Sequence, residues 1–218
     1  MIKSVIAVAA LCGASSAFAA TNLLTDGSFE SVAVAAGTYA DYSGSTLTGW
    51  VAGAGEVIEV RDALAGTALD GSNFVELDST QNSSMSTTVA TTVGTTYTLS
   101  FWYSNRATTA ANTAFAGNVV PASSNGLSYD IGAGAVAVPT LATDTSADNL
   151  WTPYTITFVA TSTSTTLSFI ATGTSDSYGS SLDNVSLTTA VPEPTTLAMF
   201  GAGVLTLLGM GRRRNRGL

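Results

Sequence analysis

The chain has 218 residues, a length that suits one sizeable folded domain. It has no histidine and a single cysteine, Cys12, which excludes histidine-based nucleophilic catalysis, histidine-ligated zinc and disulfides within the chain. Between residues 20 and 190, two arginines accompany fourteen Asp and Glu residues, a net charge of about −12 that excludes nucleic acid and anionic membrane surfaces as expected partners.

Residues 1–19 have the pattern of an export signal. Lys3 precedes an apolar run, and Ala17 and Ala19 occupy the −3 and −1 positions of an A-x-A cleavage site. A short buried helix is one alternative, and a lipoprotein signal acylated at Cys12 is another, although the bulky residue before that cysteine disfavours it. We predict a signal peptide over residues 1–19.

The body, residues 20–190, is predicted to be all-β. The clearest strand is TTYTLSFWYS (95–104), in which large apolar residues on one face alternate with Thr, Ser and Trp102 on the other. Residues 153–162 alternate in the same way, and shorter runs of alternation mark residues 56–60, 73–79, 165–171 and 182–188. Since no part of the body has a sustained helical period, we predict a β-sandwich of two antiparallel sheets. The stretches 31–46 and 105–126 are weakly patterned and are predicted to be long loops.

Six aromatic residues are the candidates for stacking on sugars, and the three tyrosines among them lie in loop-like segments. The six are Trp50, Trp102, Trp151, Tyr39, Tyr42 and Tyr178. For Trp50 and Trp102 the alternative, packing between the two sheets, is favoured by their positions. No single residue is assigned to a ligand at this point.

Carboxylates are the catalytic groups that this composition leaves. A glycosidase-type pair could come from Glu56, Glu59, Glu76 and Asp78. Glu76 and Asp78 share one face of a predicted strand, and the favoured alternative is a solvent-facing polar edge. We therefore predict that the protein is not an enzyme.

The C-terminal segment, residues 191–218, has a different character. Thr195–Gly211 is uncharged and largely apolar, and as a helix it would span about 25 Å, slightly less than a hydrocarbon core of ~30 Å. Four arginines follow it: Arg212, Arg213, Arg214 and Arg216. Because positive charge beside a membrane span stays in the cytoplasm, we predict a transmembrane helix with the body outside.

The order Pro192-Glu193-Pro194, apolar run and arginine cluster resembles the PEP-CTERM protein-sorting signal. The resemblance implies export through the inner membrane and temporary anchoring there. It also implies processing near the Pro-Glu-Pro by an exosortase, and a final place at the cell surface or in an extracellular matrix that contains exopolysaccharide.

The body also resembles the galactose-binding-like jelly rolls, which include many carbohydrate-binding modules. The segments that carry this resemblance are NLLTDGSFES (22–31), Gly49-Trp50, DGSNFVELD (70–78), GTTYTLSFWYS (94–104), 149–169 and SLDNVSL (181–187). The resemblance implies a structural calcium ion between the first segment and the last strand, with Glu30 and Asp183 as carboxylate ligands.

The alternation of the last strand supports the calcium interpretation, because it places Asp183 on the same face as Val185 and Leu187. A carboxylate turned toward a core needs a partner, and the body offers few basic side chains. The open alternative is an Asp at a strand start that accepts hydrogen bonds from turn amides.

Together these features predict an exported, non-catalytic surface or matrix protein that interacts with exopolysaccharide. A purely structural or adhesive matrix protein without a glycan ligand is the alternative. A carboxylate-based enzyme acting on glycosides is the third and least favoured hypothesis.

Overall fold

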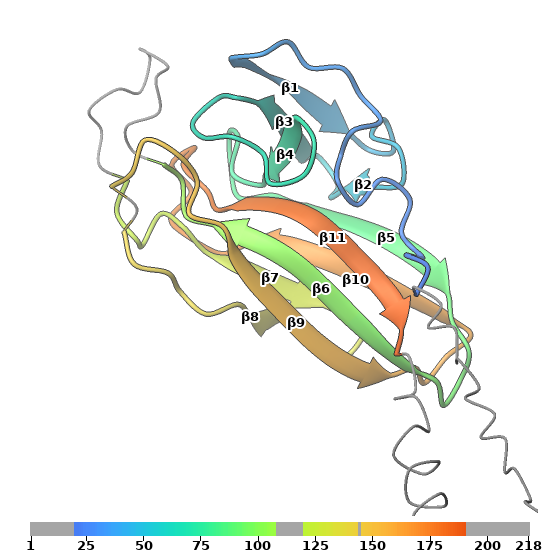
Figure 1. The fold of residues 1–218 in the computed structure, drawn as a ribbon. Coiled ribbons are helices and arrows are strands. Elements are labelled where there is room, and N and C mark those ends of the chain that lie inside the picture. Colours follow the sequence, from blue (N-terminus) through green and yellow to red (C-terminus); the bar gives the residue numbers. More distant parts are fainter. Residues whose placement is uncertain (1–19, 108–119, 144, 191–218) are drawn as a thin grey trace, which may run out of the picture. The chain divides into compact units, whose positions relative to one another are not determined.

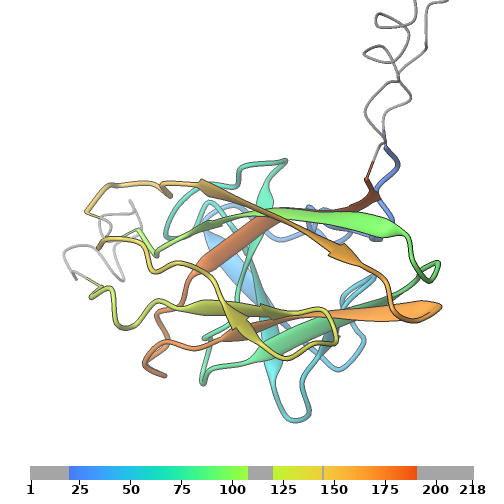
Figure 2. The ribbon, with the colours of Figure 1, turned by 90° about the horizontal axis from the view of Figure 1, so that it is seen from below.

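A computed structural model describes residues 20–107, 120–143 and 145–190, and these form a β-sandwich of two antiparallel sheets (Figures 1 and 2), as predicted. The larger sheet has the order β1-β3-β4-β11-β6-β9. Its strands are β1 (Thr38–Ser43), β3 (Val57–Asp62), β4 (Asn73–Glu76), β6 (Thr96–Ser104), β9 (Thr152–Val159) and β11 (Ser181–Thr189).

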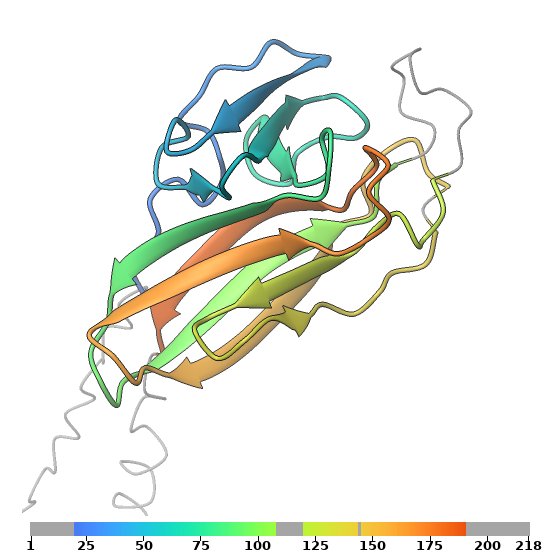
Figure 3. The same ribbon diagram turned by 180° about the vertical axis from the view of Figure 1, so that it is seen from behind.

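The smaller sheet, which faces the viewer in Figure 3, has the order β2-β5-β10-β7-β8. Its strands are β2 (Val51–Ala52), β5 (Ser84–Ala90), β7 (Leu127–Asp130), β8 (Val136–Ala137) and β10 (Ser164–Ala171). All strand pairs in both sheets are antiparallel, and segments from Thr21 to Ala190 form one compact unit.

Aromatic packing between the two sheets forms the centre of the core. Phe101 of β6 meets Phe169 of β10 edge to face, with ring centroids 5.0 Å apart. Trp50 is 1 % exposed and lies against Phe169 and Phe29. The alternation of β6 therefore marks a strand with one buried face, as predicted. Its residues Tyr97, Leu99, Phe101 and Tyr103 are buried, and the residues between them face outward.

The sequence patterns missed several strands, of which β1 and β5 are the longest. The stretch 31–46 is not one long loop, because β1 lies within it and pairs with β3 along its whole length. β1 is an edge strand without a fully buried residue, and only Ala40 and Tyr42 are half-buried, so its sequence has little apolar alternation. In β5, Ser and Thr dilute the alternation, although Met85 and Val89 are buried.

The strand β11 contains a bulge that changes which side chains face the core. Its register against β6 shifts between Asp183 and Ser186, and Asn184 has a positive φ of 49°. Asp183 consequently stands opposite Trp102, whereas Val185 and Leu187 lie in the core. The prediction that Asp183 shares a face with these two residues is wrong, because a bulge breaks the period of two.

The predicted signal peptide and the predicted transmembrane helix lie outside the described residues. Across residues 20–107, 120–143 and 145–190, we find no helix with the length and apolar character needed to cross a membrane.

Candidate functional site

Three carboxylates lie side by side on the outward face of the six-stranded sheet. In the register of β1, β3 and β4, Asp41 stands opposite Glu59, and Glu59 stands opposite Glu76. Like charges on directly opposed positions destabilise a sheet. This carboxylate row (Asp41, Glu59 and Glu76) therefore requires positive charge close by.

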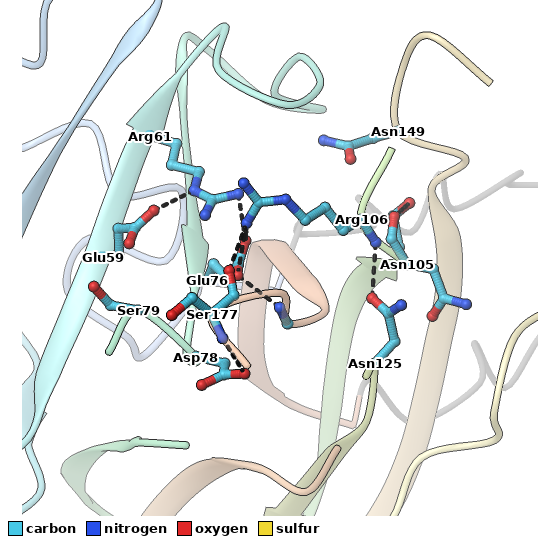
Figure 4. A network of polar contacts seen from close by, with 12 residues as sticks. Glu59, Arg61, Glu76, Asp78, Ser79, Asn105, Arg106, Asn125, Asn149 and Ser177 are labelled. Carbon is cyan, nitrogen blue, oxygen red and sulfur yellow. Dashed lines mark hydrogen bonds and ion pairs between the residues drawn. The ribbon is translucent and has the colours of Figure 1, made fainter. Parts of the chain in front are cut away.

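Both arginines of the body supply that charge (Figure 4). Arg61 forms ion pairs with Glu59 through Nε and with Glu76 through Nη1. Arg106, which follows β6, donates from Nη1 to the two carboxylate oxygens of Glu76 at 2.9 and 2.8 Å. The backbone N–H of Gly179 donates to Glu76 at 2.6 Å. The two positive side chains thus converge on one carboxylate.

This network is withdrawn from solvent. Glu76 has no exposed surface, and Arg61 and Arg106 are each 2 % exposed. Burial raises the pKa of the Glu76 carboxyl, and the two guanidinium groups act in the opposite direction. Burial also lowers the pKa of Arg106, while Glu76 opposes that change. Each buried charge is therefore stabilised by its oppositely charged neighbours, and removal of one leaves another uncompensated.

A pocket of about 230 Å³ opens beside the network. Its lining residues are Tyr39, Asp41, Glu59, Arg61, Leu64, Ser79, Thr80, Arg106 and Ser177. Tyr39 is 54 % exposed, and Asp41 is exposed and accepts a hydrogen bond from Ser79 Oγ at 3.2 Å. Burial and the charge of Glu59 raise the pKa of Asp41. The pocket combines an exposed aromatic ring and an exposed carboxylate with buried charged groups.

Asp78 anchors the turn that covers the network. Its Oδ2 accepts hydrogen bonds from the backbone N–H groups of Asp176 and Ser177, each at 3.1 Å. The Ser177 carbonyl oxygen in turn accepts a hydrogen bond from Arg106 at 3.3 Å. Glu76 and Asp78 are both fully buried, so the prediction of a solvent-facing polar edge is wrong. The covering turn is nearly one hundred positions away in sequence and left no local signal.

The four carboxylates considered for catalysis all have partners within the fold. Glu56 accepts hydrogen bonds from the backbone N–H and the hydroxyl of Ser84, both at 2.7 Å. Glu59 and Glu76 pair with arginines, and Asp78 holds the turn described above. These contacts give each carboxylate a structural role.

Asp183 is fully buried, as expected, but its contacts are with backbone amides. Its Oδ2 accepts hydrogen bonds from the N–H groups of Leu69 and Asp70 at 2.7 and 3.0 Å, and its Oδ1 accepts from Asn184 at 2.6 Å. Burial raises the pKa of Asp183 to about 6, and these amides partly offset the increase.

Glu30 binds the same loop a few residues further along. Its Oε1 accepts hydrogen bonds from the N–H groups of Ser72 and Asn73 at 2.8 and 2.6 Å. Between the two anchor points Gly71 has a φ of 76°, and a Cβ there would collide with the Glu30 carboxyl group. Glu30 and Asp183 together therefore hold the loop 69–73 against the sheet.

The described contacts supply amide donors, and no further oxygen ligands, around the predicted calcium site. Calcium takes six to eight oxygen ligands, whereas the loop presents N–H groups to both carboxylates. In the described part of the chain, no cluster of three or more Asp, Glu, His or Cys side chains could hold a metal ion. The calcium site therefore stays a prediction, and the structure gives Glu30 and Asp183 another role.

The aromatic candidates separate into packed and exposed groups. Trp50 lies in the core, as favoured, and its indole N–H donates to the Asp26 carbonyl oxygen at 3.0 Å. Trp102 does not pack between the sheets, because it alternates with the buried Phe101 and is half-buried on the outward face. Of the other candidates, Tyr39 is an exposed residue of the pocket.

The remaining aromatic residues have contacts of their own. Tyr42 packs against the core, and Tyr178 lies under the Arg106 guanidinium at 4.9 Å. The Trp151 indole N–H donates to the Thr67 carbonyl oxygen at 3.0 Å. The sorting residues Pro192, Glu193, Pro194, Arg212, Arg213, Arg214 and Arg216 lie outside the described residues.

Two family descriptions match the sequence. Residues 22–188 match "Protein of unknown function (DUF642)", and residues 190–215 match the PEP-CTERM protein-sorting motif. The second match confirms the resemblance of the C-terminal segment and implies export and C-terminal sorting to the cell surface. No curated protein matches the chain.

Solved structures with a similar fold include several carbohydrate-binding modules. TmCBM61, solved in complex with β-1,4-galactotriose, is 16 % identical, with a TM-score of 0.42 over 78 % of this chain and 99 % of that one. A family 35 module from Clostridium thermocellum is 12 % identical, with a TM-score of 0.42 over 70 % and 99 %. An arabinose-bound α-L-arabinofuranosidase is 11 % identical, with a TM-score of 0.47 over 79 % of this chain and 27 % of that one.

Proposed function

This chain belongs to the DUF642 family, and we propose that it is an exosortase-sorted surface or matrix protein whose β-sandwich binds neutral exopolysaccharide without catalysis. The PEP-CTERM motif supports the sorting half of this proposal. Anchoring in the inner membrane precedes processing near Pro192, Glu193 and Pro194. The pocket beside Tyr39 supports the binding half.

The observation that carries the binding proposal is the exposed Tyr39 ring next to Asp41 and Arg61 in one pocket. A flat aromatic ring can stack on the apolar face of a pyranose, and a carboxylate accepts hydrogen bonds from sugar hydroxyls. At about 230 Å³ the pocket is below the ~300–1,000 Å³ of pockets for drug-sized ligands. It therefore suits one sugar unit of a longer chain.

The charge of the domain selects among glycans. Residues 20–190 carry a net charge of about −12, and both arginines of this stretch are already paired with carboxylates. A polyuronate or a sulfated glycan would be repelled on approach. A neutral polysaccharide meets no such barrier, so it is the expected ligand.

The same pairing supports a non-catalytic role. Glycoside hydrolysis needs one carboxyl group that protonates the leaving oxygen and a second that acts as nucleophile or base. Glu76 is fully buried beneath two arginines, and Glu59 is tied to Arg61. Bound glycan would therefore be released unchanged.

Affinity electrophoresis of the full chain tests the proposal. We expect gels containing a neutral galactan or glucan to retard it, and gels containing polygalacturonate to leave its mobility unchanged. Tyr39→Ala should abolish the retardation. Thr166→Ala, on the outward face of the other sheet, is the matched control and should migrate like the parent.

Three outcomes separate the hypotheses. Equal migration of the parent chain in every gel would refute glycan binding and leave a structural or adhesive matrix role. Retardation that Tyr39→Ala does not alter would place the binding site elsewhere. Release of reducing ends from the polysaccharide would establish an enzyme instead.

A further inference from the structure

The four edge strands of the sandwich differ in how well they are protected against pairing with another strand. In the smaller sheet, the edges β2 and β8 have two residues each. In the larger sheet, the edge β1 carries the exposed carboxylate Asp41. Short edges and charged edges both discourage pairing. The remaining edge, β9, has eight residues, TPYTITFV, and no charge.

Every second residue of β9 directs its backbone N–H and C=O groups toward the open edge of the sheet. The N–H of Ala160 donates to the Thr95 carbonyl oxygen, so the even-numbered residues of β9 direct their backbone groups to β6. The odd-numbered residues direct theirs to the other side, where the sheet order has no further strand among the described residues. Thr155, Thr157 and Val159 each offer an N–H there, and Pro153 offers none.

The side chains of β9 add apolar surface to this edge. Tyr154, Ile156 and Phe158 pack against the core but remain half-buried, and Val159 is 55 % exposed. Such residues gain burial when another strand is added beside them. The edge therefore offers both backbone bonds and apolar area to a partner.

The charge distribution indicates which partner fits. Two copies of the domain repel each other over most of their surface, since residues 20–190 carry a net charge of about −12. However, residues 149–175 contain no charged residue, and neither do residues 79–105, which include the neighbouring strand β6. Two copies can approach each other at this edge without placing like charges together.

We propose that β9 pairs antiparallel with β9 of a second copy of this chain, joining the two larger sheets into one continuous sheet across a two-fold axis. Side chains must keep their faces, so odd-numbered residues pair with odd-numbered ones. A register centred on Thr157 uses every free N–H, because Thr157 faces Thr157 of the second copy and Thr155 faces its Val159. The contact is isologous and closes at two copies.

The dimer leaves the pocket accessible, because Tyr39 lies on β1, the opposite edge of the same sheet. The dimer then has two glycan sites and crosslinks polysaccharide chains. This consequence is the one part of the inference that rests on the proposed glycan binding. The pairing of β9 does not depend on glycan binding and is tested separately.

Cysteine crosslinking of the exported full chain tests the dimer. The only native cysteine, Cys12, lies in the predicted signal peptide, so an introduced thiol is easily assigned. In a hydrogen-bonded antiparallel pair the Cα atoms are about 5.5 Å apart, which suits a disulfide. Thr157→Cys should give a disulfide-linked dimer on non-reducing gels, whereas Thr166→Cys, on the central strand β10, should stay at the background of the parent chain.

A charge-pair experiment provides the second measurement. Thr157→Lys and Thr157→Glu, each alone, should be monomeric by light scattering. Differently tagged copies of the two variants should capture each other when mixed. If the disulfide-linked dimer of Thr157→Cys is no more abundant than that of Thr166→Cys, the proposal is wrong. If Thr157→Cys is instead crosslinked to a different protein, the partner of β9 is not a second copy of this chain.

Discussion

Arg106 and Glu76 are thirty positions apart in the sequence, yet Nη1 of Arg106 donates to both oxygens of the Glu76 carboxylate, at 2.9 and 2.8 Å. Glu76 lies on β4, and Arg106 follows β6, with β11 between these strands in the sheet. The contact therefore crosses the end of β11. It connects the carboxylate row to the segment that leaves β6.

Removal of Arg106 should destabilise the fold strongly. In Arg106→Met, Glu76 keeps Arg61 but loses its second cation while buried, and we expect unfolding free energy to fall by roughly 2–5 kcal/mol. Denaturant unfolding of the full chain measures the change. Adding Glu76→Gln should restore part of the loss, because no uncompensated charge then remains. Additive effects of the two substitutions would contradict the coupling.

Asp183 should make stability depend on pH between about 4 and 6. Its pKa is raised from 3.8 to about 6, so the folded state binds the proton more tightly than the unfolded state. This stabilisation is complete below the unfolded pKa and is lost as pH rises through about 6. Between these two pH values the contribution of Asp183 to the free energy of unfolding falls by roughly 3 kcal/mol.

Unfolding midpoints of the parent chain and of Asp183→Asn, measured from pH 3.5 to 7, test this dependence. The Asn side chain keeps an acceptor for the loop amides but does not titrate. The parent should lose stability relative to the variant as pH increases. A constant difference between the two proteins across the range would refute the raised pKa.

The calcium ion predicted at Glu30 and Asp183 can be tested in the same assay. A cation that binds only the folded state raises the melting midpoint by mass action, and Asp183→Asn should abolish most of that increase. Equal midpoints in calcium and in a chelator would leave the two carboxylates as anchors of the loop 69–73, which is the role that their amide contacts describe.

The sorting prediction is tested by fractionation of the producing cells. Changing Arg212, Arg213, Arg214 and Arg216 to Gln removes the charge that keeps the tail in the cytoplasm, so processing or topology should change. Deletion of residues 192–218 should release the body in soluble form. Parent-like localisation of both variants would refute the sorting function of this segment.

The sequence by itself determined the fold class and the presence of a sorting motif. The alternation of β6, β9, β10 and β11 requires strands with one buried face, because a period of two can bury apolar residues on one side of a sheet. The PEP-CTERM segment is contiguous, so its order of Pro-Glu-Pro, apolar run and arginines is readable without a structure. The absence of histidine likewise excluded whole classes of catalysis.

Only the tertiary structure decided where the charged residues are. Glu76 and Asp78 alternate like residues of an exposed edge, but Arg106 and the turn at residues 176–179 bury them from distant parts of the chain. Asp183 was predicted on the core face, and a bulge at the next residue moved it to the other face. Local periodicity reports which way a side chain points from its strand, whereas ion pairs and covering loops depend on which strands become neighbours, and that is decided by the packing of the whole chain.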